Sequence, residues 1–151
     1  MEKLNFPAFN LLLKSKENKT FIFDSLRKKW LILSPEEWVR QHCIRYLIEY
    51  KGCPLGLIQV EKKLKVNRIE KRYDIIVFNR EGAISLLVEC KRPNVTINQE
   101  TFDQIAQYNL SLNSDYLMIT NGLYHYYCQM DFEQKKYIFL KDLPPFKSNM
   151  K

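Results

Sequence analysis

A chain of 151 residues in which 46% are hydrophobic suits one domain with a single core, and a second core is not expected. Lysine and arginine number 24 against 17 acidic residues, a balance that favours a polyanionic partner or an acidic surface but indicates no particular fold. The sequence holds no apolar run of about 18 residues and no signal-peptide pattern, so we expect a cytoplasmic protein with no membrane segment.

The N-terminal part of the chain is expected to contain an arm, a small hairpin and one helix. Residues 1–20 lack a clear hydrophobic period and form the arm, and two short apolar segments within residues 21–33 predict the hairpin. Ser-Pro-Glu-Glu at residues 34–37 supplies an N-cap, a proline at the first helical position and a glutamate three residues past the cap. A helix therefore begins after Ser34, and Gly52 marks its end.

Three strands are expected after this helix. Residues 57–66 alternate between apolar and polar side chains, which predicts the first strand. Residues 73–78 and 84–90 are rich in β-branched and aromatic residues and flank Asn-Arg-Glu-Gly at residues 79–82. They predict a hairpin with a short turn.

The chain is expected to return to this sheet through a second helix. The Thr-x-x-Gln pattern that starts at Thr96 opens the helix, which runs to about residue 112. Residues 116–120 form a short apolar strand, and a right-handed crossover places it parallel to residues 84–91.

The C-terminal part adds two strands and a tail. Asn-Gly at residues 121–122 predicts a tight turn into strands at residues 123–129 and 137–140. Residues 144–151 are expected to be disordered or loosely attached, which leaves a single domain over residues 21–143. The order helix, three antiparallel strands, helix, strand predicts an α/β protein with a mixed central sheet and extra N- and C-terminal strands.

The cysteines and histidines argue against two kinds of site chemistry. The four cysteines show no Cys-x-x-Cys spacing, so we expect reduced and mostly buried thiols. His42 and His125 are the only histidines, and they lack the companions of a tetrahedral zinc site or of a Ser/His or Cys/His nucleophilic site.

Two acids and a lysine stand within the otherwise apolar hairpin. If residues 79–82 are the whole loop, Asp74 lies opposite Leu87 and diagonal to Glu89, whereas a shift of two residues puts Asp74 directly opposite Glu89. In both registers Asp74, Glu89 and Lys91 project from the same face of the sheet.

Two neighbouring carboxylates are a poor structural choice unless a cation lies between them. At roughly 5 Å and an effective dielectric constant of about 20, Asp74 and Glu89 repel by about 3 kcal/mol. Mg²⁺ takes one or two carboxylates and completes its shell with waters and phosphate oxygens. Lys91 can then orient or deprotonate a metal-bound water, or stabilise charge that develops on phosphorus.

This pattern, Asp74 followed by Glu89-Cys90-Lys91, resembles the PD-(D/E)xK nuclease superfamily, whose core has the predicted order of elements. Residues 71–127 look most like the nuclease domain at the N-terminus of type I restriction enzyme R subunits. The resemblance implies that Asp74, Glu89 and the Cys90 carbonyl ligate Mg²⁺, with Mn²⁺ as an alternative, and that Lys91 serves the attacking water.

The resemblance also implies roles for residues on the two helices. Gln104 and Tyr108 match the Gln-x-x-x-Tyr motif of the family, although without the resemblance they are an ordinary polar edge with a half-buried tyrosine. The superfamily often adds a glutamate from the first helix, and Glu36 and Glu37 are the candidates. Glu36 shares the inward stripe of the helix, whereas Glu37 is expected to complete the capping box. One departure from the family pattern is Tyr73, which stands where the motif has proline.

A run of basic residues leads into Asp74. Such a run is usually a solvated face, but next to a metal site it can bind the phosphates that flank the scissile one, which fixes position without reading bases. The candidates for nucleic-acid contact are Lys62, Lys63, Lys65, Arg72 and Arg92.

The function expected from these residues is a Mg²⁺-dependent DNA endonuclease domain related to restriction, which works with DNA and other subunits of a restriction complex. The alternative is a nucleic-acid-binding or partner-docking module that keeps the fold without turnover. At the level of the site, the alternative is that Asp74 and Glu89 are strand-end charges paired with Arg72, Lys91 or Arg92 in a solvated salt-bridge cluster. The oligomeric state stays open, because a one-site domain cuts both strands either as two copies or by two successive nicks.

Overall fold

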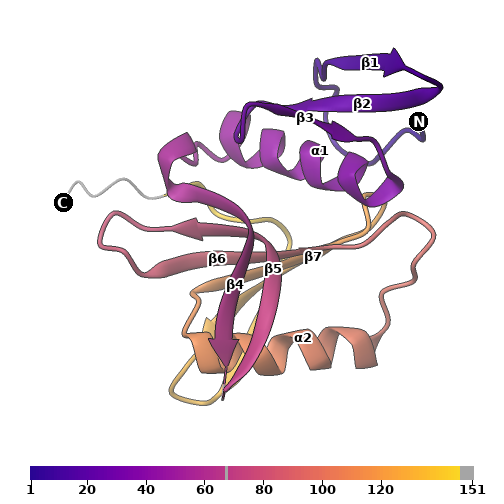
Figure 1. Cartoon of the computed structure of the whole chain (residues 1–151). Helices are drawn as coiled ribbons and strands as arrows, with labels where there is room; N and C mark the ends of the chain where they lie inside the picture. The colour runs from indigo at the N-terminus through magenta and orange to yellow at the C-terminus, as the bar shows by residue number, and fades with distance from the viewer. Residues whose placement is uncertain (67, 147–151) are drawn as a thin grey trace.

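The structure, a computed structural model, describes residues 1–66 and 68–146, apart from the side chains of Val66 and Tyr108. Two helices and two β-sheets make up the described chain (Figure 1). The small sheet is antiparallel and has the order β1 (Leu13–Lys16), β2 (Lys19–Asp24), β3 (Lys29–Ile32). The predicted hairpin at residues 21–33 is therefore present, and the arm adds a third strand to it.

The central sheet has six strands in the order of the chain, and only its β6–β7 pair is parallel within the described residues. The strands are β4 (Ile58–Val66), β5 (Ile69–Phe78), β6 (Ile84–Cys90), β7 (Tyr116–Thr120), β8 (His125–Asp131) and β9 (Lys136–Leu140). A short 3₁₀ helix, η1 (Leu55–Leu57), precedes β4. The predicted α/β class and the parallel crossover into residues 116–120 are confirmed.

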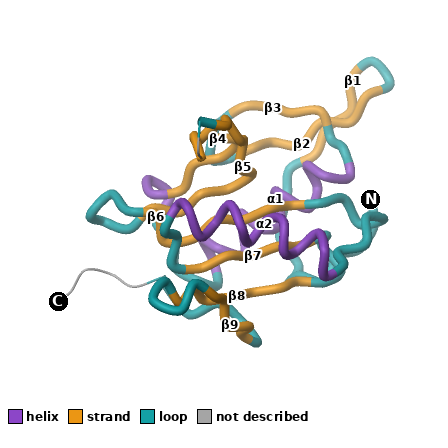
Figure 2. Tube along the Cα trace, turned by 90° about the horizontal axis from the view of Figure 1, so that it is seen from below, coloured by secondary structure: helices purple, strands orange, loops and turns teal. Residues whose placement is uncertain are grey.

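Helices cover both faces of the central sheet (Figures 1 and 2). The first helix, α1 (Pro35–Glu49), lies on one face together with the small sheet, and α2 (Gln99–Leu112) crosses the other face. Two clusters of buried side chains result, one under each helix. None of the helices in the described part of the chain is both long and apolar enough to cross a membrane.

The start of α1 follows the prediction, but its capping box does not. The Ser34 hydroxyl accepts a hydrogen bond from the Glu37 N–H at 3.0 Å, with Pro35 at the first helical position. The Glu37 carboxylate, however, accepts hydrogen bonds from Arg40 at 2.6 Å and Gln41 at 2.9 Å. Both of these hydrogen-bond donors lie inside the helix, so the Glu37 carboxylate serves an ion pair and does not complete the capping box.

The start of α2 differs by two residues from the prediction. The N-cap is Asn98, whose side-chain oxygen accepts a hydrogen bond from the Thr101 N–H at 2.8 Å. Thr96 precedes the helix and is exposed. The predicted inward side chains are confirmed, because Phe102, Ile105 and Ala106 are all buried against the sheet.

Both ends of the described chain pack onto the domain. Leu4 is buried in the cluster under α1, where its side chain lies against Gly122. At the other end, the Phe146 N–H donates to the Lys51 carbonyl at 2.8 Å, and the ring packs against the same cluster. Phe146 thus differs from the loosely attached tail expected for residues 144–151, of which residues 147–151 lie outside the described residues. All four cysteines are buried free thiols, as predicted.

Candidate active site

The β5–β6 ladder ends one residue before Asp74 and Glu89. Ile75 pairs with Val88 and Ile76 with Leu87, and Ile75–Val88 is the last pair of this ladder before Asp74 and Glu89. A bulge between Val77 and Phe78 takes up the extra loop residue. Of the two registers considered for the sequence, the one shifted by two residues is therefore observed.

A break in the β4–β5 ladder lies at the position of Asp74. Val60 pairs with Ile75 and Lys62 with Tyr73, so the ladder omits Glu61 and Asp74. Glu61 has a φ of +52°, in the left-handed region that costs a non-glycine residue roughly 1–2 kcal/mol. Strained backbone of this kind is concentrated at functional sites.

The break exchanges the faces of the hairpin. Ile75 packs in the cluster under α1, whereas Tyr73, two residues earlier, packs in the cluster under α2. A regular strand would place both on one face. The prediction that Asp74 and Glu89 project from a common face of a regular ladder therefore does not hold, because Asp74 turns toward α1 and Glu89 follows Leu87 on the side of α2.

The carboxylate of Asp74 is held by two donors from different elements. Its Oδ1 accepts a hydrogen bond from Arg40 Nη2 of α1 at 3.0 Å, and its Oδ2 accepts one from the Cys90 N–H of β6 at 2.8 Å. Because the N–H and C=O of a strand residue point to the same side, the Cys90 carbonyl faces the side of Asp74. This orientation is the one that the predicted role of the Cys90 carbonyl requires.

Three charged side chains, those of Lys71, Asp74 and Lys91, act on Glu89. Its side chain is buried, and Lys71 Nζ lies 3.1 Å from its Oε2. Burial and then the negative charge of Asp74 raise the pKa of Glu89, whereas Lys71 and Lys91 lower that pKa. Asp74 and Lys91 are thus both within electrostatic reach of Glu89 at the end of β6.

Each acid has its own basic partner, and neither partner is Lys91. Lys71 forms the ion pair with Glu89 and also lies over the Tyr73 ring, 4.6 Å from its centroid. Asp74 pairs with Arg40, whose side chain is 8% exposed. The direct partners of the two carboxylates are therefore Arg40 and Lys71, and not Arg72, Lys91 or Arg92, and the Lys91 side chain is half-buried.

Arg40 and Lys71 are the site residues that were not predicted from the sequence. For Lys71 the signal was present, since it stands in the basic run and three residues before Asp74. Arg40 follows Glu36 and Glu37 by one helical turn, and this spacing indicates an ion pair within the helix. Its contact with Asp74, 34 residues away, follows only from the packing of α1 on the sheet.

Of the two glutamates at the start of α1, Glu37 is the buried one, whereas Glu36 was expected on the inward stripe. Glu37 is buried and pairs with Arg40, whereas the Glu36 side chain is 46% exposed and reaches Arg40 Nη2 at 3.4 Å. Both therefore approach the site through Arg40. The proposed metal contact of Glu36 remains a prediction.

The motif residues on α2 are less defined. Gln104 is exposed on the helix, while the side chain of Tyr108 lies outside the described residues. The burial of Ile105 and Ala106 places Gln104 away from the core. A role for either residue in catalysis remains a prediction.

The predicted nucleic-acid contacts lie mostly on the β4–β5 hairpin. Lys62, Lys63 and Lys65 are exposed on β4, and Arg72 is exposed on β5 directly opposite Lys63. Lys63 lies 3.8 Å from Glu70, and Arg72 lies 3.6 Å from Glu61. Arg92 is exposed just after β6.

The donor set at the end of β6 is compatible with Mg²⁺. Two carboxylates and one carbonyl match the number of protein ligands that Mg²⁺ takes when waters and phosphate complete its octahedron. In the part of the chain that the structure describes, no three His, Cys, Asp or Glu side chains gather in a way that could hold a metal without such additions. The fit thus rests on Asp74, Glu89 and Cys90, with Arg40 as a competing cation.

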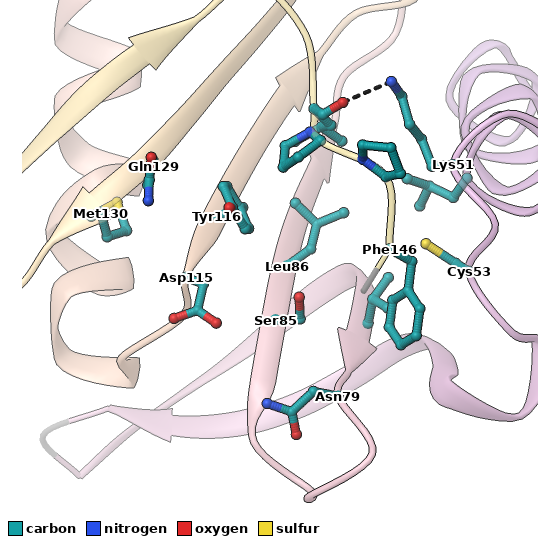
Figure 3. A pocket seen from close by; sticks show the side chains of 15 residues that line it. Lys51, Cys53, Asn79, Ser85, Leu86, Asp115, Tyr116, Gln129, Met130 and Phe146 are labelled. Carbon is teal, nitrogen blue, oxygen red and sulfur yellow. Dashed lines mark hydrogen bonds between the residues drawn. The ribbon is translucent and has the colours of Figure 1, made fainter. Parts of the chain in front are cut away.

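A separate cavity of about 380 Å³ lies at the opposite end of β6 (Figure 3). Polar side chains, among them Ser85, Asp115 and Gln129, share its wall with Leu86 and Phe146. None of the predicted site residues lines this cavity within the described chain. Asp74 and Glu89 therefore lie outside this cavity.

Comparisons with known proteins identify a family and a solved relative. The family model described as type I restriction enzyme R protein N terminus (HSDR_N) matches residues 35–144. No curated protein matches the chain. Among solved structures, the chain is similar to the fragment of a putative HsdR subunit of a type I restriction enzyme from Vibrio vulnificus YJ016, at 19% identity and a TM-score of 0.46.

That similarity covers 68% of this chain and 22% of the solved chain, so this chain spans about a fifth of the length of that relative. The family match is more extensive, because residues 35–144 include both helices and all six strands of the central sheet. The chain therefore belongs to the family of type I restriction enzyme R protein N-termini.

Proposed function

We propose that this chain is a Mg²⁺-dependent DNA endonuclease domain of a restriction system. Membership of the R protein family supports the link to restriction. The observation that carries the nuclease proposal is the 2.8 Å hydrogen bond that the Asp74 carboxylate accepts from the N–H of Cys90, the residue between the buried Glu89 and Lys91. Two acids and a lysine in that relation suit phosphodiester hydrolysis.

Each residue of the candidate site has a separate proposed role. Asp74, Glu89 and the Cys90 carbonyl hold Mg²⁺, which when bound supplies a Lewis acid and lowers the pKa of a coordinated water. Lys91 orients or deprotonates the attacking water and stabilises charge on the phosphoryl group. Gln104 and Tyr108 steady the site or the DNA strand, and the exposed basic residues of the β4–β5 hairpin bind flanking phosphates.

Nicking of supercoiled plasmid DNA with added Mg²⁺ tests this proposal. Lys91→Met keeps the apolar stem of the side chain and removes the charge, so we expect it to lower the nicking rate about 100-fold or more. Lys136→Met is a matched control, because Lys136 is exposed on β9 at the other end of the sheet. Equal nicking by the parent and Lys91→Met would refute the role of Lys91.

A second function is favoured by the state of Asp74. Both of its oxygens already accept a hydrogen bond, from Arg40 and from the Cys90 N–H, which suits a domain that binds DNA or a partner subunit without cleaving. This module requires DNA binding that Lys91→Met leaves unchanged and no cleavage at any concentration of Mg²⁺ or Mn²⁺. The nicking assay, run beside a DNA-binding titration, separates the two functions.

A further inference from the structure

Arg40 connects the candidate metal site to a group of acids on other elements. Its Nη2 lies 3.0 Å from Asp74 Oδ1 and 3.4 Å from Glu36 Oε2. Its Nη1 lies 2.6 Å from Glu37 Oε1 and 3.2 Å from Glu61 Oε1. One buried guanidinium thus contacts four carboxylates. Of these four, the proposed function uses only Asp74 to hold Mg²⁺.

The ion pairs around Arg40 form a network with an excess of negative charge. Within the described residues, five carboxylates and three guanidinium groups are joined by ion pairs of at most 3.9 Å. They are Asp24, Glu36, Glu37, Glu61 and Asp74 with Arg27, Arg40 and Arg72. The network therefore has a net charge of −2, which one divalent cation would neutralise. This excess of negative charge stands in a chain whose net charge is +7.

A divalent cation and the Arg40 guanidinium cannot both bind Asp74 closely. Charges of like sign at adjacent positions around one carboxylate repel strongly in a partly buried site. The Cys90 N–H can keep its hydrogen bond, because a carboxylate oxygen has a second lone pair that a metal can use. Arg40 is therefore the group that must yield when a metal binds.

Arg40 can leave Asp74 without leaving a buried charge unpaired. Its shortest contact is with Glu37, in the same helix, and Glu36 is within reach and partly exposed. A guanidinium has five N–H donors, so it can exchange one acceptor for another while it stays in the network. This exchange avoids the penalty of an isolated buried ion.

We propose that Arg40 competes with the divalent cation for Asp74, so that metal binding moves the guanidinium onto Glu36 and Glu37. In the metal-free protein Arg40 neutralises and positions Asp74, and in doing so it sets the affinity of the site for metal. This inference rests on the proposed metal site at Asp74 and Glu89. Arg40 is a positioning residue here, since it acts through Asp74 and not on the substrate.

Binding of Mn²⁺ alone, measured by electron paramagnetic resonance without DNA, tests the inference without any turnover. Arg40→Met should bind Mn²⁺ about 10-fold more tightly than the parent, a size typical of coupling between two competing ligands. Arg45→Met is the matched control, because Arg45 lies on the same helix and pairs only with the exposed Glu49 among the described acids. Its Mn²⁺ affinity should equal that of the parent.

A double variant links the gain to Asp74. In the Asp74→Asn background the effect of Arg40→Met should disappear, because the shared carboxylate is gone. If Arg40→Met does not fold, a second measurement on the parent protein tests the same inference. Nitrogen-15 spectra of the Arg40 guanidinium should change on addition of Mg²⁺, with faster rotation of the group once Asp74 releases it, while the Arg45 signals stay constant.

The outcomes distinguish this inference from the proposed function. The proposed competition between Arg40 and the cation is overturned if the parent and Arg40→Met bind Mn²⁺ equally, or if Mg²⁺ leaves the Arg40 spectrum unchanged. Neither result would contradict the metal site itself. If the parent shows no Mn²⁺ binding that is lost in Asp74→Asn, the metal site and the inference are both overturned.

Discussion

At the scale of single residues, the structure reverses the effect expected for Asp74. From the sequence, Asp74 and Glu89 form a repelling pair, so neutralising Asp74 should relieve strain. In the structure the Asp74 carboxylate instead accepts hydrogen bonds from Arg40 and the Cys90 N–H, and its side chain is only 15% exposed. The repulsion with Glu89 is offset by these partners and by Lys71.

We therefore expect Asp74→Asn to destabilise the protein in the absence of divalent metal, by about 1 to 3 kcal/mol. The amide keeps one oxygen acceptor but loses the ion pair with Arg40. Urea denaturation in the presence of a chelator measures the change, with Glu133→Gln as an exposed control. A higher denaturation midpoint for Asp74→Asn would mean that the repulsion outweighs the two hydrogen bonds.

At the scale of elements, short-range signals predicted where helices begin but not always which residue caps them. Ser34 and Pro35 define the start of α1 without ambiguity. Before α2, Thr96 and Asn98 are both residues that favour an N-cap, and the structure selects Asn98. The choice depends on the path of the chain after β6, which a local pattern does not contain.

Replacement of the two candidates tests this cap. Asn98→Ala removes the acceptor of the Thr101 N–H and hydroxyl and should lower the free energy of unfolding by about 1 kcal/mol. Thr96→Ala alters an exposed residue outside the helix and should change it by less than about 0.5 kcal/mol. Thermal or urea unfolding of the two variants gives the comparison, and equal losses would contradict the assignment of the cap.

The break in β4 shows why part of the site could not be predicted. The apolar residues Val60 and Leu64 keep the same even-numbered spacing on either side of Glu61, so their pattern contains no sign of a change of face. A glutamate with positive φ is uncommon, and glycine or asparagine would have been the usual signal. The pattern therefore predicted the strands and the three acidic and basic motif residues, but it could not predict the direction of Asp74 or its contact with Arg40.

At the scale of the whole molecule, charges of opposite sign lie on neighbouring regions. The acidic network around Arg40 adjoins the β4–β5 hairpin, whose exposed lysines were predicted to act as one group. The register divides them, because Lys63 and Lys65 share one face with Arg72, whereas Lys62 lies opposite Tyr73 on the other face. Lys63 and Arg72 are directly opposite like charges, and among the described residues each has only a distant carboxylate partner, at 3.8 Å and 3.6 Å, that a DNA phosphate can replace.

The face with Lys63 and Lys65 is therefore the one that we expect to bind DNA phosphates. Lys63→Gln/Lys65→Gln should weaken binding uniformly across DNA sequences and flatten the dependence of log affinity on log salt by about two units, since each phosphate that is no longer neutralised removes about 0.9 from the slope. Lys135→Gln/Lys136→Gln removes the same charge from the β8–β9 turn, at the far end of the sheet, and should leave the slope unchanged. Fluorescence anisotropy between low and moderate salt measures both slopes. If the two double variants flatten the slope equally, the effect comes from net charge alone, and the hairpin is not the phosphate-binding surface.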